Sequence, residues 1–139
     1  MDDMDTNLAD FADSLGDLGQ SLGDLAQAAV RDAVTVFRDK VAARTPVKTG
    51  RARAGWLLTV DETSDEVPPP GDYPDAGGQD AQDIPLAQSY YCVQNNLDYI
   101  SDLEDGTSTQ APQGMVALSL AEFDDDLAQA VENLGLEGA

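Results

Sequence analysis

A regular spacing of large apolar residues in the first third of the chain limits the fold more than any other feature. Leucine or phenylalanine recurs at intervals of three or four residues, at Leu8, Phe11, Leu15, Leu18, Leu22 and Leu25. This spacing is that of a heptad seam and predicts an amphipathic helix. Beyond it the apolar face rotates, to Val30, Val34, Phe37 and Val41. We expect one long helix over residues 1–44, because the residue before Pro46 is driven out of the helical region.

Such a helix is long for a chain of 139 residues. About 38 continuous residues would span about 57 Å at 1.5 Å per residue. Each glycine in a helix interior costs about 1 kcal/mol relative to alanine, so from the three glycines here we expect either a break near residues 16–23 or a frayed first half of the helix. Residues 14–20 (SLGDLGQ) recur almost unchanged as 21–27 (SLGDLAQ). Two heptads are compatible with packing on the same domain or with a coiled coil, and the pattern leaves both open.

The rest of the chain alternates apolar runs with polar loops. Residues 54–60 form an apolar run typical of a strand, and residues 86–103 resume with extended segments. Between them, residues 61–85 contain five prolines, three glycines and eight acidic residues, which predicts a long acidic loop. Residues 115–134 have the spacing of a second amphipathic helix. The predicted fold is a single α+β domain over residues 1–139, with both helices packed on a small antiparallel sheet.

The charge of the chain is strongly negative and unevenly distributed. Seven Lys and Arg residues stand against 27 Asp and Glu residues, a formal net charge of −20. All seven cations lie within residues 31–53, which contain two acids and so carry +5. This segregation would steer one copy onto the acidic surface of another, although an ordinary mixed-charge helix end has the same composition. The excess of aspartate and the scarcity of lysine also suggest a halophilic source, because salt screens the repulsion within an acidic surface.

The composition argues against several classes of function. The chain has no histidine and one cysteine, Cys92, so it lacks the pairs that activate a nucleophile and the usual zinc or copper ligands. It has no phosphate-binding glycine loop, and the acidic run 124–126 lacks the spacing of a calcium loop. We therefore expect no enzyme, no cofactor and no metal site. We also expect no membrane segment, because no apolar run approaches ~18 residues.

Two blocks of sequence stand out against this background. Residues 45–56 read TPVKTGRARAGW, and residues 95–123 read NNLDYISDLEDGTSTQAPQGMVALSLAEF. The first block begins where the long helix is expected to end, and it continues with a turn at Thr49 and Gly50. Either block alone is a weak signal, but their order along the chain makes the pair specific.

Arg51 and Arg53 of the first block are candidate interface residues. Two positions apart in an extended chain, both would project from one face of a strand. Paired arginines in this arrangement suit the capture of carboxylates. We expect Glu104 and Asp105 to be their partners, either within the fold or across an interface between copies.

The two blocks resemble a family of small proteins of tailed viruses, the neck or tail-completion proteins. The first block matches the family pattern at Thr45, Pro46, Val47, Thr49, Gly50, Arg51 and Trp56. The second block matches it at Asn95 or Asn96, Tyr99, Glu104, Gly106, Thr107, Ser108, Gln110, Ala111, Pro112, Gly114, Met115 and Val116. Lys48 departs from the pattern, which usually has aspartate there.

The resemblance implies a virion structural protein of the head–tail connector, made in the host cytoplasm and placed at the head–tail junction or in the tail. It implies a homo-oligomeric ring, expected to be a hexamer, that contacts head-closure, tail-terminator or tail-tube proteins. Viral DNA would pass through the ring without specific binding. The pattern residues expected to determine the fold, as turn, core anchor or helix entry, are Pro46, Thr49, Gly50, Trp56, Asn96, Tyr99, Gly106, Pro112 and Gly114.

Two other functions are compatible with the composition. An acidic module that mimics DNA and inhibits a nucleic-acid-binding protein would explain the charge of −20. It would not explain the clustering of all the cations in residues 31–53, or the two blocks. A helical dimerisation module would use the apolar seam from Leu8 to Leu25. Self-association that disappears on removal of residues 1–27 would favour the dimerisation module.

Overall fold

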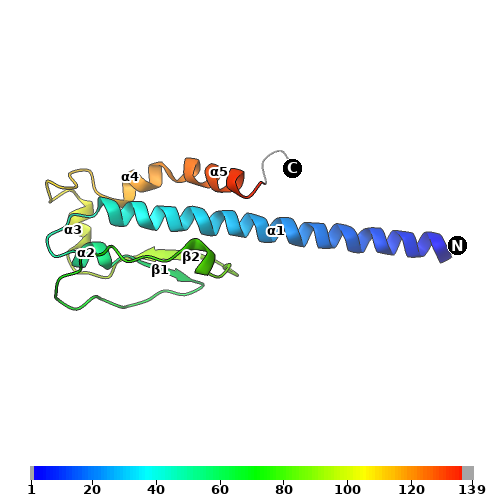
Figure 1. The fold of residues 1–139 in the computed structure, drawn as a ribbon, viewed down its shortest axis with the longest axis horizontal. Coiled ribbons are helices and arrows are strands. Elements are labelled where there is room, and N and C mark those ends of the chain that lie inside the picture. The colour runs from blue at the N-terminus through cyan, green and yellow to red at the C-terminus, as the bar shows by residue number, and fades with distance from the viewer. Residues whose placement is uncertain (1, 136–139) are drawn as a thin grey trace.

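The computed structural model describes residues 2–135, with side chains described from residue 8 onward. Its elements, in chain order, are α1 (Asp2–Arg44), α2 (Arg51–Ala54), β1 (Leu57–Val60), the 3-10 turn η1 (Ala81–Asp83), β2 (Tyr91–Gln94), α3 (Ile100–Glu104), α4 (Val116–Ala121) and α5 (Phe123–Asn133). Helix α1 is the axis of the molecule, with the sheet, α2 and α3 on one side and α4 and α5 on the other (Figure 1). The predicted α+β class, with two long helical segments and a small antiparallel sheet, is confirmed.

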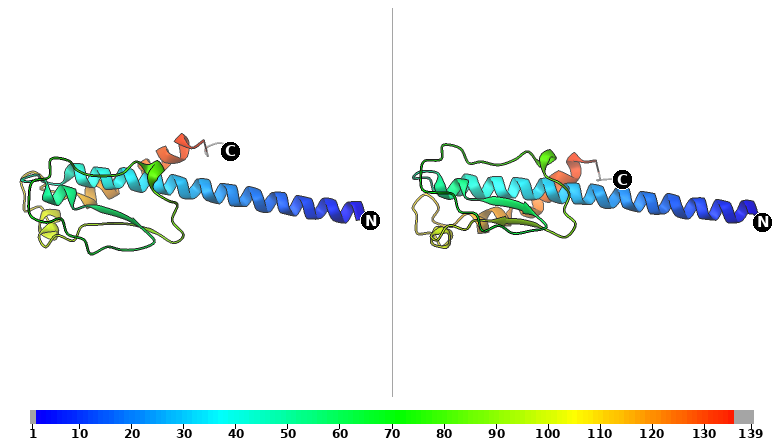
Figure 2. Two further views of the ribbon diagram at one scale, coloured as in Figure 1. Left: turned by 60° about the horizontal axis from the view of Figure 1, so that its bottom comes forward. Right: turned by 90° about the horizontal axis from the view of Figure 1, so that it is seen from below.

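Helix α1 is unbroken over its 43 residues. The break expected near residues 16–23 is therefore wrong. Glycine weakens a helix but keeps its backbone N–H donor, and Asp2–Arg44 contains no proline to remove one. The N-terminal part of α1 extends far beyond the other elements as a single rod (Figures 1 and 2).

Only the C-terminal part of α1 packs against the rest of the chain. Ala29 and Ala33, at most 1% exposed, form a cluster with Ala130 of α5. Small residues let the two helices approach closely, and the larger apolar side chains of α5 surround this contact. Next to it, the rings of Phe37 and Phe123 meet edge to face with centroids 6.1 Å apart. Helix α1 is thus half core helix and half exposed rod.

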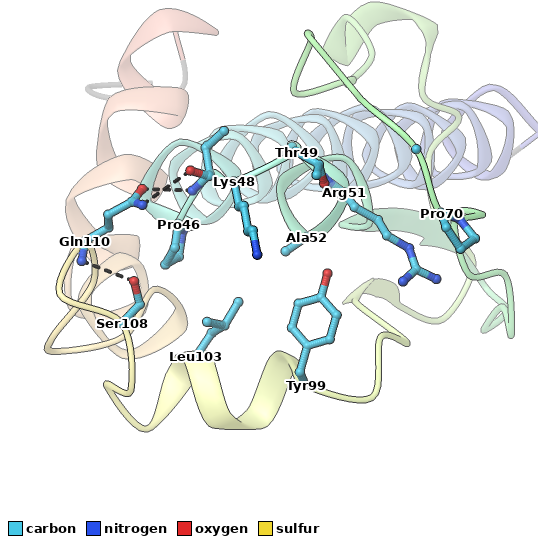
Figure 3. Close-up of a pocket in the computed structure, with 13 residues that line it drawn as sticks. Pro46, Lys48, Thr49, Arg51, Ala52, Pro70, Tyr99, Leu103, Ser108 and Gln110 are labelled. Carbon is cyan, nitrogen blue, oxygen red and sulfur yellow. Dashed lines mark hydrogen bonds between the residues drawn. The ribbon is translucent and has the colours of Figure 1, made fainter.

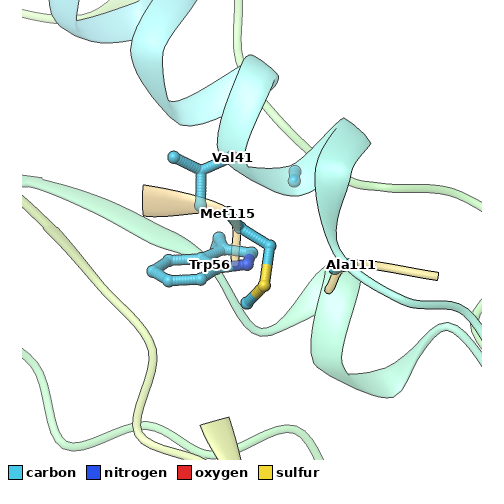
Figure 4. Close-up of a cluster of buried hydrophobic side chains, with 5 residues drawn as sticks. Val41, Trp56, Ala111 and Met115 are labelled. Atoms are coloured by element: carbon cyan, nitrogen blue, oxygen red, sulfur yellow. The ribbon is translucent and has the colours of Figure 1, made fainter. Parts of the chain in front are cut away.

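A second buried cluster lies where α1 ends, around Trp56. Val41, Ala111 and Met115 pack against the indole ring (Figure 4). The Trp56 Nε1–H donates to Thr45 Oγ1 at 2.7 Å, and the Thr45 hydroxyl donates to the Val41 carbonyl at 2.7 Å. The polar edge of the ring is therefore satisfied inside the core. The role of Trp56 expected from the resemblance, that of a core anchor, agrees with this packing.

The sheet is smaller than predicted and has two strands. Strand β1 pairs antiparallel with β2, with Leu57 opposite Gln94 and Val60 opposite Tyr91. The strand expected over residues 54–60 thus begins only at Leu57. Residues 51–54 form a helical turn instead, in which the Ala54 N–H donates to the Gly50 carbonyl at 2.9 Å. Arg and Ala, which alternate here, are good helix formers. Their local preference for helix prevails over the extended conformation that we predicted.

Two further boundaries differ from the prediction. Of the expected strands over 86–103 only Tyr91–Gln94 is one, and Ile100–Glu104 is helical because Ile100 and Leu103 reach the Trp56 cluster from one face of a helical turn. The helix expected over 115–134 is divided into α4 and α5 at Glu122. The carboxylate of Glu122 is held there by cations of α1.

The acidic loop over residues 61–85 contains η1 and follows the outside of the molecule (Figure 2). Asp61 anchors its start, and accepts hydrogen bonds from the backbone N–H groups of Gln88, Ser89 and Tyr90 at 2.6–3.1 Å. These backbone donors hold the pKa of Asp61 below its usual value. In the described part of the chain, no helix has the length and hydropathy that a membrane crossing requires.

Candidate functional site: a cavity between the two sequence blocks

The two sequence blocks, far apart in the chain, meet around one open cavity. Its volume is about 670 Å³, and it lies between the turn after α1 and helix α3 (Figure 3). The first block supplies residues 46–52, and the second block supplies Tyr99, Leu103, Ser108 and Gln110. Pro70 and Gly71 of the acidic loop complete the wall. The cavity is thus built from three segments that only the tertiary fold brings together.

Gln110 joins the two blocks directly. Its Oε1 accepts from the Val47 N–H at 2.9 Å, and its Nε2 donates to the Val47 carbonyl at 3.3 Å. The side-chain amide therefore acts as a neighbouring strand would, and satisfies both backbone groups of Val47. Ser108 supports this arrangement, because its Oγ accepts from the Gln110 N–H at 3.2 Å. Gln110 matches the family pattern, but its role is visible only in the fold.

The predicted turn at Thr49 and Gly50 is present and holds the acidic loop. Thr49 Oγ1 accepts from the Arg51 N–H at 3.2 Å, and the Thr49 carbonyl accepts from the Tyr73 N–H at 2.7 Å. Gly50 has φ +87°, in the left-handed region that favours glycine. The Tyr73 carbonyl lies where a Gly50 side chain would be.

Arg51 and Arg53 bind the acidic loop through its backbone. Arg51 Nε donates to the Pro68 carbonyl at 2.8 Å, and Arg53 Nη2 donates to the Pro74 carbonyl at 2.8 Å. The expected pairing of these arginines with Glu104 and Asp105 within the fold is therefore wrong. In the helical turn α2 the two side chains diverge, and loop carbonyls lie nearer to them than the second block. Pairing across an interface between copies stays a prediction.

Glu104 instead caps helix α4. Its Oε1 accepts from the backbone N–H groups of Met115 and Val116 at 2.9 and 2.8 Å, and its Oε2 accepts from Ala117 at 3.1 Å. Desolvation raises the pKa of Glu104, but these three donors outweigh it and leave the pKa below its usual value. A carboxylate here also complements the positive end of the helix. Asp105 is exposed beside it.

Several pattern residues have conformational roles around this cap. Gly106 and Gly114 have φ of +89° and +82°, and a Cβ at either position would overlap backbone, at the Pro112 and Glu104 carbonyls respectively. Asn96 Nδ2 donates to the Ser64 and Glu66 carbonyls at 2.9 Å each and so ties the acidic loop to β2. Pro46 and Tyr99, two pattern residues without such a role, line the cavity.

Almost all the cations of residues 31–53 bind partners within the fold. Arg38, only 5% exposed, reaches from α1 to the Trp56 carbonyl and to the acidic loop. Lys40 and Arg44 pair with Glu122, and Lys40 also pairs with Asp126 at 2.8 Å. Asp126 and Glu122 hold the pKa of Lys40 above its usual value. Among the described side chains, Lys48 is the cation that makes no hydrogen bond or ion pair, and its ammonium points into the cavity (Figure 3).

Sequence reasoning missed the role of Arg38. The sequence did contain an indication of this role. Arg38 follows Val34 by one helical turn and so interrupts the apolar face of α1. A charged residue on a buried face requires internal acceptors. Which acceptors it has could be seen only in the fold.

We expect Glu104→Gln to lower the free energy of unfolding by about 1–2 kcal/mol at neutral pH, because the neutral amide accepts more weakly and opposes an N–H donor with its own NH₂. A carboxyl whose pKa is lowered by folding stabilises above its unfolded pKa, and this contribution disappears as the pH falls through the folded pKa. The difference between variant and native protein should therefore shrink in acid. Urea unfolding measures it, with Asp105→Asn as the exposed control. Equal losses in the two variants would contradict the capping role.

Comparison with known proteins finds one family that is similar to part of this chain. Residues 9–69 match the model of the family described as "Bacteriophage HK97-gp10, putative tail-component". Over these residues the chain is similar to this family of phage tail components. The resemblance to a tailed-virus family, expected from the two blocks, is thereby confirmed. The match includes most of α1, the first block and β1, whereas the second block lies outside it.

The match shows similarity to phage tail components over residues 9–69 of the chain. No curated protein and no solved structure matches the chain.

Proposed function

We propose that this tail component is a ring-forming subunit of the head–tail connector, and that the cavity between its two sequence blocks receives an acidic surface of the neighbouring copy. A closed ring needs a heterologous contact, in which one patch of a subunit meets a different patch of the next. The cavity is a concave patch at one end of α1, and a second copy can offer it a different patch. The observation that carries the proposal is the free ammonium of Lys48 directed into this cavity.

Charge complementarity selects an acidic occupant. Outside residues 31–53 the chain carries only acidic charges, a net −25. The other cations are engaged internally, so the copies would repel each other at most orientations. Lys48 provides an attractive contact that favours one orientation over the rest. High salt would aid assembly by screening the remaining repulsion between the acidic surfaces.

A ring with a largely acidic surface would also suit the passage of viral DNA. Uncompensated carboxylates repel phosphates, so the duplex would not adhere to the lumen. A lumen lined by Arg or Lys would contradict this part of the proposal. The expected ring is a hexamer in contact with head-closure, tail-terminator or tail-tube proteins.

The charge of Lys48 provides the test. We expect Lys48→Glu to fold normally, because residue 48 is exposed and its side chain makes no hydrogen bond or ion pair with the described residues. A like-charge contact should weaken association by about tenfold to a hundredfold per interface, since 1.4 kcal/mol corresponds to a factor of ten. The mass of the assembled species in high salt, measured over a range of protein concentrations, gives this shift. Trp56 fluorescence reports whether the variant is folded.

Lys48→Arg is the matched control, because it keeps the charge at the same position. It should assemble like the native protein. If Lys48→Glu assembles as well as Lys48→Arg, the cavity is not the subunit interface. If the native protein is monomeric at all concentrations in high salt, and is absent from rings in purified particles, the ring itself is rejected.

A further inference from the structure

The projecting part of α1, residues 8–25, has an apolar stripe that no described residue covers. Its leucine and phenylalanine side chains are 38–62% exposed, from Leu25 near the body to Phe11. Helix α5 covers α1 only from Ala29 onward, so the stripe lies beyond it (Figure 1). Exposed apolar surface of this length is rare on a protein that functions as a monomer. The stripe therefore marks a docking surface.

A second apolar surface lies on the body of the same chain. It is an open groove of about 220 Å³, with α1 as its floor, β2 as one wall and the junction of α4 and α5 as the other. Leu120 of this junction is 59% exposed. The groove has room for the end of a leucine or phenylalanine side chain. The residues that line it are all apolar or aromatic: Val34, Phe37, Tyr91, Val93, Leu120 and Phe123.

We propose that the stripe of one copy docks in this groove on the neighbouring copy, so that the projecting helices run around the ring. This inference rests on the proposed ring, in which two different patches of each subunit must meet. The stripe is convex, the groove is concave, and both are apolar. Because α1 is one unbroken helix that carries the stripe and also forms the floor of the groove, the stripe cannot reach the groove of its own chain. A second copy brings the two together.

The charge pattern permits this contact between two acidic copies. The acidic residues of the projecting part, Asp10, Asp13, Asp17 and Asp24, lie on the face opposite the stripe. No charged residue lines the groove. On a chain with a net charge of −20, the stripe and the groove are surfaces through which two copies can touch without bringing carboxylates together. The positions on either side of the stripe are small and uncharged, namely Ala12, Ser14, Gly19, Ser21, Ala26 and Ala28.

Ring symmetry sets the relative direction of the two helices. In a hexamer a rotation of about 60° relates adjacent copies, so the directions of their α1 helices differ by at most that angle. A crossing angle of about 50°, the commonest between packed helices, lies within this limit. The docked helix therefore runs in the same general direction as the α1 beneath it.

The positions of the two patches along α1 keep the lumen open. The midpoint of the stripe lies about 19 residues before the floor of the groove, which is about 28 Å along the helix at 1.5 Å per residue. Six such spans, joined at crossings near 50°, enclose a hexagon about 49 Å across between opposite sides, or about 38 Å once the width of a helix is subtracted. The projecting helices therefore surround the path of the DNA and do not cross it.

Cysteine cross-linking between two variants of the full-length protein tests the inference. In a Cys92→Ser background, Leu15→Cys places a thiol in the stripe, and Leu120→Cys places one at the wall of the groove. The two variants are mixed, assembled in high salt and treated with a short bismaleimide. Because docking gives the two thiols a high effective concentration, the mixture should give about tenfold more covalent dimer than either variant alone. Asp17→Cys, on the opposite face of the same turn, is the matched control and should give no such increase when mixed with Leu120→Cys.

The other outcomes separate this inference from the proposed function. Rings that form without linkage of Leu15→Cys to Leu120→Cys would overturn the docking and leave the proposed function in place. Abundant dimer from Leu15→Cys alone would show that stripe packs on stripe, and would also overturn the docking. In purified particles, linkage of Leu15→Cys to a different virion protein would make that protein the occupant and overturn the inference. Linkage of the mixed pair in a species that never closes into a ring would support the contact between stripe and groove and reject the ring.

Discussion

Replacing Arg38 with methionine is expected to lower the free energy of unfolding by about 3 kcal/mol, because buried acceptors lose their donors. Arg38 Nε and Nη2 donate to the Trp56 carbonyl at 3.3 and 3.1 Å. Nη2 also donates to the Ala76 carbonyl at 2.8 Å, and Nη1 donates to the Gly77 carbonyl at 3.2 Å. One side chain thus joins α1, the start of β1 and the acidic loop. Methionine fills a similar volume but supplies no donor.

Urea unfolding followed by fluorescence measures this change, since Trp56 is the one tryptophan and lies in the affected core. Arg44→Met is the matched control. Arg44 is 32% exposed and pairs with Glu122, and exposed ion pairs are typically worth under ~1 kcal/mol. If the two substitutions cost the same, Arg38 is not the internal hub that its contacts indicate.

Replacing Gly50 with alanine is expected to cost about 2–4 kcal/mol, because alanine at positive φ is strained by about 1–2 kcal/mol and overlap with a neighbour adds to this. The new Cβ would overlap the Tyr73 carbonyl oxygen and lie 3.0 Å from its carbon. Relief of the overlap requires Tyr73 to move, which would break its 2.7 Å hydrogen bond to the Thr49 carbonyl. The acidic loop would then detach from the cavity wall.

The same substitution has the opposite sign in α1. A Cβ on Gly16 would meet nothing within 4 Å, and the position is helical. Gly16→Ala should therefore strengthen the projecting helix by about 1 kcal/mol. Thermal unfolding followed by circular dichroism compares the two variants. A Gly50→Ala protein as stable as the native one would show that the turn and the loop are free to move apart.

Predictions from the sequence were more reliable for features set by interactions between neighbouring residues than for features set by contacts between distant ones. Helix α1 was predicted from its apolar spacing, because a helix closes its hydrogen bonds within four residues. The break in it was predicted wrongly, since glycine propensity was given more weight than the absence of proline. Residues 51–54 and 100–104 were read as extended although both are helical turns. For segments this short, tertiary contacts and hydrogen bonds outweigh weak local preferences.

In the candidate site, too, some features could be predicted from the sequence and others depend on the fold. The resemblance brought the two blocks together and identified Thr49, Gly50 and Trp56 as structural positions, which their contacts support. It did not show that the blocks enclose a cavity, or that Gln110 links them through Val47. The expected pairing of Arg51 with carboxylates was chemically reasonable, but the fold placed a loop carbonyl nearer.

By itself, the sequence determined the long helix, the acidic character of the surface and the similarity of residues 9–69 to phage tail components. These follow from side-chain periodicity, charge and motif order, all of which can be read along the chain. Only the tertiary structure decided what the arginines hold and where the unpaired Lys48 points. The physical reason is that their partners are backbone carbonyls of Pro68 and Ala76. Every residue has a backbone carbonyl, so the identities of the residues do not indicate which carbonyls a buried guanidinium will bind.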